Sequence, residues 1–315
     1  GNGSWYFAGS FGGTLTLGNH SATSSGNHDV YVAKRSASGE WLWLSSGGSS
    51  QSGDSAEEIA VDSQGNVYVA GLFTHAGSFG DHDVDPLHSG YDDIFLAKLN
   101  QTGDWQWATE GGHPDQEYVM DMDIGPDDEV VLAVRNHNGG TYNHADDSGS
   151  VSFSTSSNEW EVVVAKADGD GTWEWVAHAG TTGSDEYVSD IVTGSGGEVY
   201  LTGRANDGAS FGSSTFSTAD GDSGPFAAKL ASSGVWEWVL NAHDEDDGQG
   251  HMGQSVALDS DGVAYFFGEI GSQAFGSAGT MSERYYLKPV SSDGVIGDWD
   301  VSIIVGDLQH GGGSA

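Results

Sequence analysis

The sequence predicts an all-β chain, a β-propeller of five four-stranded antiparallel blades. The first observation is an internal repeat in which one position holds every lysine of the chain: Lys34, Lys98, Lys166, Lys229 and Lys288. The second is a Trp-x-Trp segment that begins seven residues after the lysine in the first four copies: Trp41/Trp43, Trp105/Trp107, Trp173/Trp175 and Trp236/Trp238. The third is alternation of apolar and polar residues between Gly, Asp and Ser turns, which is typical of strands.

The elements of one repeat are clearest in the second copy, which predicts strand A at 56–62, B at 66–71, C at 92–98 and D at 105–109. Successive lysines are 64, 68, 63 and 59 residues apart, a longer period than the roughly 40–50 residues of common propeller repeats. Four antiparallel strands repeated five times form blades that bury their faces against each other. The sequence therefore predicts one domain over 1–315, with blades at about 1–48 plus 300–307, 54–110, 116–178, 185–241 and 251–299, and a Gly-rich tail at 308–315.

Closure of the ring depends on the two ends of the chain. The first copy begins at strand B (Gly3–Gly9), whereas Val301–Asp307 aligns with strand A because Asp307 matches Asp62. We expect Val301–Val305 to pair with the strand near Trp5–Gly9 and to complete the first blade. A fragment of a larger ring or array is the alternative, because the fifth copy lacks Trp-x-Trp.

The lysines are expected to be structural. Their aliphatic stems can lie along the Trp-x-Trp strand while the ammonium meets a carboxylate or an indole face. An acidic residue stands five residues before the lysine in four copies: Asp29, Asp93, Glu161 and Glu283. That odd offset places the two side chains on opposite faces and about 16 Å apart. The partner of each lysine must come from another strand or blade.

The repeat resembles the SBBP-type β-propeller repeats, whose pattern is matched by Ile59 to Gly71 and onward. The resemblance covers nearly the whole chain. It departs in one detail, since Phe-Gly stands at 11–12, 79–80, 211–212 and 275–276 where that family more often has Phe-Pro, and the third copy has Phe153-Ser154. The resemblance implies a propeller in a surface or secreted protein, without one shared activity.

Composition narrows the setting. The chain has 47 acidic and 9 basic residues, a formal charge of −38, a pI near 4.1 and no cysteine. This charge excludes nucleic acid and anionic membranes as partners, and no apolar run approaches the ~20 residues of a membrane span. We expect an extracellular or cell-surface protein of a high-salt or marine setting, where screening makes self-repulsion tolerable. The start Gly-Asn-Gly suggests a processed or excised part of a larger surface protein or assembly.

Metal binding has one weak and one stronger candidate. Asp168–Gly171 and Asp259–Gly262 look like the start of calcium loops, but they align with tight turns that favour Asp and Gly for backbone reasons. The long B–C loops, in contrast, carry seven of the twelve histidines and many carboxylates, all predicted to emerge on one face with the D–A connections. Oxygen ligands from several loops suit Ca²⁺, and the candidate ligands are Asp81, Asp83, Asp85, Asp244, Asp246 and Asp247. The alternative is a set of solvated polar loops.

Two registers of acidic residues lie along strand A, which lines the centre of a propeller. One comprises Asp54, Glu117, Glu186 and His251, and the other comprises Glu58, Asp121 and Asp190. Three interpretations stay open: pairing between blades, a cation site, or the acid, base and third carboxylate of a glycosidase-like funnel.

No nucleophile elbow, phosphate loop, dinucleotide fingerprint or HExxH is present. The favoured function is therefore a non-catalytic binding or adhesion module that presents its B–C loops to a glycan or surface protein. The alternative is a carbohydrate-active enzyme that uses the central carboxylates.

Overall fold

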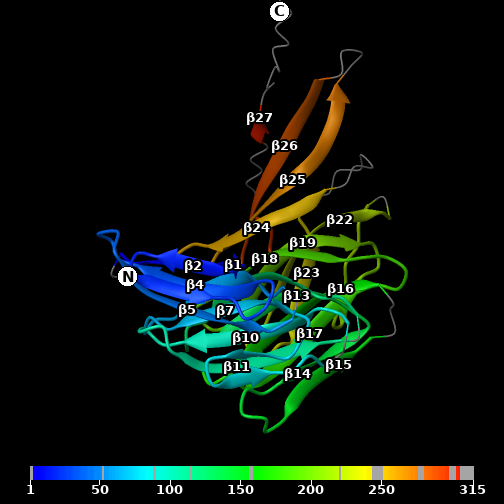
Figure 1. The fold of residues 1–315 in the computed structure, drawn as a ribbon. Helices are drawn as coiled ribbons and strands as arrows, with labels where there is room; N and C mark the ends of the chain where they lie inside the picture. Colours follow the sequence, from blue (N-terminus) through cyan, green and yellow to red (C-terminus); the bar gives the residue numbers. More distant parts are fainter. Residues whose placement is uncertain are drawn as a thin grey trace, which may run out of the picture.

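The computed structural model describes residues 3–51, 53–87, 90–113, 115–155, 159–219, 221–242, 251–275, 280–297 and 303–305, with side chains placed outside 270–284 and 303–305. The described residues form strands and turns and no helix, so the all-β prediction is confirmed. Antiparallel sheets follow one another in a propeller-like arrangement, from the blue β1 to the orange β26 (Figure 1).

Each lysine repeat forms one sheet in which strands B, C and D are neighbours. Strands B, C and D are β1 (Trp5–Phe11), β4 (Asp29–Arg35) and β5 (Trp41–Ser49) in repeat 1, and β7 (Val67–Phe73), β10 (Asp93–Leu99) and β11 (Trp105–Gly112) in repeat 2. They are β13 (Val130–His137), β16 (Trp160–Ala167) and β17 (Trp173–Gly180) in repeat 3, and β19 (Val199–Asn206), β22 (Ser223–Leu230) and β23 (Trp236–Asn241) in repeat 4. In repeat 5 they are β25 (Ala264–Phe275), β26 (Thr280–Val290) and β27 (Ile303–Val305).

Strand A precedes strand B in repeats 2 to 5, as β6 (Ser55–Val61), β12 (Tyr118–Ile124), β18 (Tyr187–Thr193) and β24 (Met252–Leu258). Each A–B ladder has a bulge at the same place, immediately before Glu58, Asp121, Asp190 or Ser255. A bulge re-aims the side chain beside it. Four strands A therefore present one equivalent polar residue in the same way.

The prediction that the C-terminal strand closes the ring is wrong for the described part of that segment. Ile303–Val305 pairs with Glu283–Tyr285 of β26 rather than with β1. The fifth copy has no Trp-x-Trp strand to occupy this edge of β26, and an apolar segment satisfies its backbone groups instead. The β25–β26 hairpin projects away from the other sheets, far from the N-terminal strand (Figure 1).

The B–C loops contain hairpins: β2 (Thr14–Leu17) with β3 (His20–Thr23), β8 (Gly77–Phe79) with β9 (His82–Val84), β14 (Gly139–Asn143) with β15 (Ser150–Ser154), and β20 (Ser210–Phe211) with β21 (Ser214–Thr215). In repeats 2 to 4 the first hairpin strand pairs with the end of strand D of the preceding repeat, β8 with β5, β14 with β11 and β20 with β17. These loops connect neighbouring sheets.

The hairpins also correct the alignment of the Phe-Gly motif. The rings of Phe79, Tyr142 and Phe211 lie 4.9, 5.0 and 4.9 Å from the first tryptophan of their own repeats. Gly18 takes the place of Gly80 and Gly212, with φ of 60°, 64° and 60° and the same close approach to that tryptophan. Leu17 and Tyr142, not Phe11 and Phe153, are thus the structural equivalents of Phe79. The sequence alignment placed this motif wrongly because the loops differ in length, and an aromatic residue can stand either before or after the hairpin turn.

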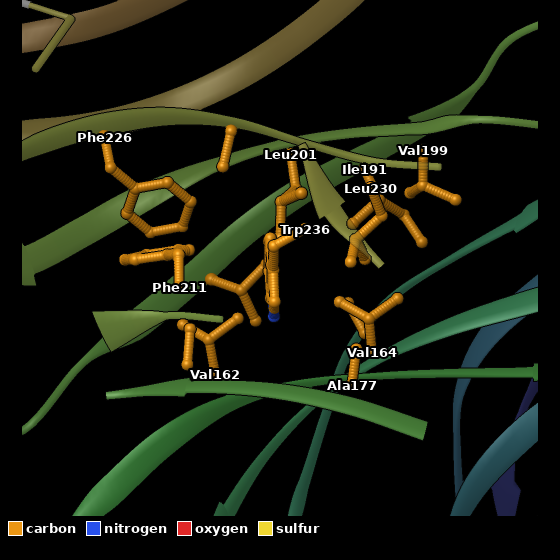
Figure 2. Close-up of a cluster of buried hydrophobic side chains, with 14 of the residues drawn as sticks. Val162, Val164, Ala177, Ile191, Val199, Leu201, Phe211, Phe226, Leu230 and Trp236 are labelled. Carbon is orange, nitrogen blue, oxygen red and sulfur yellow. The ribbon is translucent and has the colours of Figure 1, made fainter. Parts of the chain in front are cut away.

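The hydrophobic core consists of four clusters, each between two successive sheets. Figure 2 shows the cluster between repeats 3 and 4, where Val162 and Val164 of β16 face Leu201, Phe226 and Trp236. Both faces of a middle sheet are covered in this way, which explains why the central residues of its strands B and C are apolar.

A backbone oxygen in each following C–D turn accepts a hydrogen bond from a tryptophan of the preceding sheet, and at two junctions it also accepts one from a lysine. The second tryptophans, Trp43, Trp107, Trp175 and Trp238, donate from Nε1 to backbone oxygens in the following C–D turn, at 3.0, 3.1, 3.0 and 3.2 Å. Lys98 and Lys229 donate to the same oxygens as Trp107 and Trp238, at 2.7 and 3.0 Å. The prediction that the lysines have partners on other strands or blades is confirmed for these two residues.

Replacing Trp107 by Ala should lower the free energy of unfolding by about 3–5 kcal/mol, because a large buried ring is removed. Its side chain is 8% exposed, whereas that of Trp5 is 66% exposed. Trp5→Ala is therefore the control and should change stability by less than about 0.5 kcal/mol. Chemical denaturation of both variants measures the difference. Equal effects of the two substitutions would contradict the core role of Trp107, and unchanged stability with lost carbohydrate binding would assign it to a ligand site.

Candidate functional site

The second acidic register forms hydrogen bonds between successive strands A. Asp121 accepts from the backbone N–H of Ile191 in the next repeat, at 2.7 Å. Asp190 likewise accepts from Val256, at 2.7 Å, and from the Ser255 hydroxyl, at 2.6 Å. Each carboxylate is positioned by the bulge before it and joins two sheets at the centre.

The Asp190 carboxyl affects the pKa of two neighbouring carboxyl groups. Burial, and then the neighbouring Asp190 carboxyl, raises the pKa of Asp121 to about 7. Burial raises the pKa of Glu58, with further contributions from Glu57 and Asp190. The structure therefore brings Glu58, Asp121 and Asp190 into one electrostatic neighbourhood, as the sequence predicted.

The first acidic register lies elsewhere, at the junctions between repeats. Here each of its three acidic members faces the acidic residue that precedes the lysine of the previous repeat by five positions; His251 has no such counterpart, because Gly224 stands at that position. The pairs are Asp29 with Asp54, Asp93 with Glu117, and Glu161 with Glu186. All six side chains are buried, with at most 4% exposure.

A glycine at the end of strand D makes room for each pair: Gly48, Gly112 and Gly180. A Cβ on Gly48 would stand 2.6 Å from Asp54 Oδ2 and 3.1 Å from Asp29 Cγ, and one on Gly180 would stand 2.7 Å from Glu161 Cγ and 3.1 Å from Glu186 Oε2. Any larger residue would displace a buried carboxyl group.

The three pairs differ in their hydrogen-bond partners. Asp54 Oδ2 accepts from Ser49 N at 2.5 Å, and Asp29 Oδ2 accepts from the Ser25 N–H and hydroxyl at 2.9 and 2.8 Å. Glu186 accepts from Thr181 N and from the Asn206 amide, at 3.1 and 3.2 Å. The first and third pairs thus have donors on neighbouring loops.

The middle pair is less well satisfied. Glu117 Oε1 accepts from His113 N at 2.6 Å, but Oε2 is buried without a hydrogen-bond partner. Burial raises the pKa of Glu117 to about 9, opposed by the His113 N–H and reinforced by Asp93. Burial likewise raises the pKa of Glu186 to about 7 and raises that of Asp54. Glu117 therefore keeps its proton near pH 7, and Glu186 is about half protonated there.

The loop face carries a pocket of about 420 Å³, lined by residues of repeats 1 and 2: Ser25, Gly48, Ser50, Ala76, Gly77, Ser78, Asp83 and Asp85. Asp83 and Asp85 are predicted metal residues, and both side chains are exposed. Asp81 lies in the β8–β9 turn outside this lining. Asp244, Asp246 and Asp247 lie outside the described residues.

No group of three metal-ligating side chains occurs within the described ranges. Two of the loop histidines have local hydrogen-bond partners. His137 Nδ1 lies 3.0 Å from Asp115 Oδ2, and His144 Nδ1 accepts from Trp173 N at 3.0 Å. In the turns that begin at Asp168 and Asp259, backbone N–H groups of the same turn donate to the carboxylate of that aspartate, as the turn interpretation predicts.

Sequence reasoning missed the junction pairs. The sequence pattern shows the members of each pair separately, and it suggested Asp29, Asp93 and Glu161 only as partners of the lysines. The usable signal was the recurrence of three features in one junction: an acidic residue at the start of strand C, a glycine at the end of strand D, and an acidic residue before the next strand A.

Raising the pH from 5 to 9 at fixed ionic strength should lower the free energy of unfolding. Glu117, Asp121 and Glu186 keep protons in the folded chain at pH values where the unfolded chain has lost them. Their contribution is complete below the ordinary carboxyl pKa and is lost as the pH passes about 7 and then about 9. Glu117→Gln should flatten the decline above pH 7, whereas the exposed control Glu40→Gln should not. Identical pH profiles for the two variants would contradict the assignment.

Comparisons with known proteins identify no family. No family model matches the chain, and no curated protein sequence matches it. A solved structure of a protein of unknown function from Bacteroides caccae aligns with 94% of this chain and 93% of its own, at 10% identity and a TM-score of 0.39. No helix long and apolar enough to cross a membrane occurs in the described part of the chain.

Proposed function

We propose that this chain is a non-catalytic binding or adhesion module of an extracellular or cell-surface protein. In this proposal its SBBP-like repeats form a five-bladed propeller scaffold, and the B–C loops present a binding face to a glycan or a surface protein. The observation that carries the proposal is that most carboxyl groups that a catalytic funnel would need are buried or hydrogen-bonded to the next strand A.

Three of the six candidate catalytic residues are inaccessible to a substrate. Asp54, Glu117 and Glu186 are at most 1% exposed. A glycosidase needs two carboxyl groups that contact the substrate, about 5–10 Å apart. Two of the remaining candidates, Asp121 and Asp190, hold the backbone of the next strand A. This arrangement supports a structural role at the centre and leaves recognition to the loops.

The loop-face pocket supports a hydroxyl-rich ligand. Its lining combines serine hydroxyls, two exposed aspartates and half-buried glycines, and the hydroxyls and carboxylates can hydrogen-bond to sugar hydroxyls. The chain's charge of −38 favours neutral or cationic ligands over anionic ones. A neutral glycan is therefore the preferred ligand class.

One observation favours the enzyme alternative. Asp121 has a pKa of about 7 beside a second carboxylate, which is the electrostatic setting of an acid/base pair. Under this alternative, a carbohydrate-active enzyme would use Glu58, Asp121 and Asp190, and Asp121→Asn would abolish glycoside hydrolysis.

A neutral-glycan array tests the proposal directly. The parent chain should bind a subset of glycans, and Asp83→Asn with Asp85→Asn should weaken that binding by about tenfold or more, equivalent to about 1.4 kcal/mol. Asp261→Asn, an exposed aspartate in an A–B turn, is the matched control and should bind like the parent. Hydrolysis of the bound glycans that Asp121→Asn abolishes would establish the enzyme alternative.

Calcium should stabilise the same face through Asp83 and Asp85. A cation converts their mutual repulsion into attraction, and binding to the folded state raises stability by about 2.7 kcal/mol at a hundred times the dissociation constant. Melting is compared in chelator and in calcium at fixed ionic strength, since salt alone screens this acidic chain. The double Asn variant should lose the increment and Asp261→Asn should keep it. Coincident melting of the parent in both buffers would exclude a calcium site.

A further inference from the structure

The second junction, between repeats 2 and 3, contains buried polar atoms that have no hydrogen-bond partner among the described residues. They are Glu117 Oε2, the Tyr142 hydroxyl, and both the nitrogen and the oxygen of the Asn136 amide. All three side chains are at most 1% exposed. Burial, and then the Glu117 charge, raises the pKa of Tyr142, and the Asn136 amide opposes this rise, so the three groups are neighbours. Buried polar atoms in folded proteins nearly always have a partner, and a group of exceptions points to a bound water or ion.

Two of these groups are additions to the repeat. Tyr142 takes the place of a phenylalanine in repeats 2 and 4, as described above. Asn136 stands opposite the fifth residue before the lysine, where repeat 2 has Phe73 and repeat 4 has Ala205. The scaffold therefore uses apolar residues at both places, and only this junction has a hydroxyl and an amide there.

Two glycines leave room beside the polar groups. A Cβ on Gly112 would stand 2.4 Å from Asp93 Oδ1 and 3.3 Å from Glu117 Oε2, so both carboxyl groups border one point. A Cβ on Gly140 would stand 2.9 Å from the Asn136 amide nitrogen and 3.4 Å from the Gly112 carbonyl oxygen. The carboxyl pair, the amide and a backbone carbonyl thus surround the space that the two glycines leave.

We propose that this junction binds one calcium ion between repeats 2 and 3. Asp93, Glu117 and Asn136 supply oxygen ligands. The amide of Asn136 can turn its oxygen toward the ion, because the two ends of an amide are nearly the same in shape. Calcium takes roughly six to eight oxygen ligands in flexible geometry, including backbone carbonyls and water. The Tyr142 hydroxyl holds one such water.

Charge decides the class of ligand. Two ionised carboxylates in one buried space repel each other, and a divalent cation balances both charges, whereas water balances neither and a monovalent ion balances one. Calcium is preferred to magnesium, because magnesium demands near-octahedral geometry and keeps several of its waters. In the absence of metal Glu117 keeps its proton, and calcium takes the place of that proton.

The first and third junctions have side-chain donors where the second has the ion. The Ser49 hydroxyl donates to Asp54, and the Asn206 amide donates to Glu186. These donors stabilise the carboxylates directly. The calcium site is therefore specific to one junction, and the other two serve as internal controls.

Metal content and melting test the site in a chain that carries Asp83→Asn and Asp85→Asn, which removes the loop-face calcium and keeps the two proposals distinguishable. The chelator-treated chain is equilibrated with calcium or magnesium at one ionic strength, and bound metal is measured by mass spectrometry after gel filtration. The calcium sample should retain about one ion per chain and melt at a higher temperature than the magnesium sample. Glu117→Gln should lose both effects, while the matched control Glu186→Gln, at the third junction, should keep both.

Two further variants leave the carboxyl pair intact. Asn136→Ala installs the residue that repeat 4 has at this place and should weaken calcium binding at least about tenfold. Tyr142→Phe keeps the ring and should also weaken binding about tenfold, because a group that orients a metal ligand typically contributes that much to affinity. The control Tyr200→Phe removes another fully buried hydroxyl, in repeat 4, and should leave the dissociation constant within about twofold.

Three outcomes would overturn the proposal. Identical melting in calcium, magnesium and chelator, with no metal retained, would assign the junction to buried water. Retention of calcium by a Glu117→Gln variant that melts like the parent in chelator would place the ion elsewhere. Unchanged calcium binding in both Asn136→Ala and Tyr142→Phe would show that the added polar groups do not belong to the site.

Discussion

One backbone oxygen in each C–D turn holds successive sheets together. It accepts from the second tryptophan of the preceding repeat, and at two junctions it also accepts from a lysine ammonium. A glycine at φ between 79° and 87° in the same turn leaves the indole face room to approach. The ammonium groups of Lys98 and Lys229 each satisfy a carbonyl and lie over a tyrosine ring, whereas Lys166 forms ion pairs with Glu129 and Glu174.

The acidic interior is a consequence of this stacking. Successive strands C and A are brought so close at the end of strand D that Asp93 and Glu117 share one buried space. A buried ionised pair costs free energy unless it is protonated or hydrogen-bonded. The chain uses both solutions, with backbone and serine donors at the first junction and a raised pKa at the second. The carboxyl pairs at these junctions therefore lie between sheets and are not exposed, freely ionised acids.

The sequence predicts those parts of the fold that repeat with a fixed spacing. The strands around each lysine and the Trp-x-Trp strand follow from residue pattern, and so does the cross-strand position of Lys98 beside Trp107. The motif in the B–C loops was misaligned, because Phe153 matches Phe79 in letters while Tyr142 matches it in space. Closure was also mispredicted, since the alignment of Val301–Val305 with strand A ignored the vacant edge of β26. For the candidate site, the sequence supplies the registers, but the pairing of Asp29 with Asp54 depends on the rotation between sheets, which no local pattern contains.

The hairpins in the B–C loops restrict how this surface can diversify. In repeats 2 to 4 the first strand of the hairpin pairs with the preceding sheet, so its length and backbone are set by that neighbour. The second strands also pack on the scaffold, since Val84 of β9 is buried and Phe153 of β15 stacks on His178. The turns between the two strands already range from two residues after Phe211 to six after Asn143. Anyone who grafts a foreign recognition loop onto this scaffold should retain both strands of these hairpins and vary the turns between them.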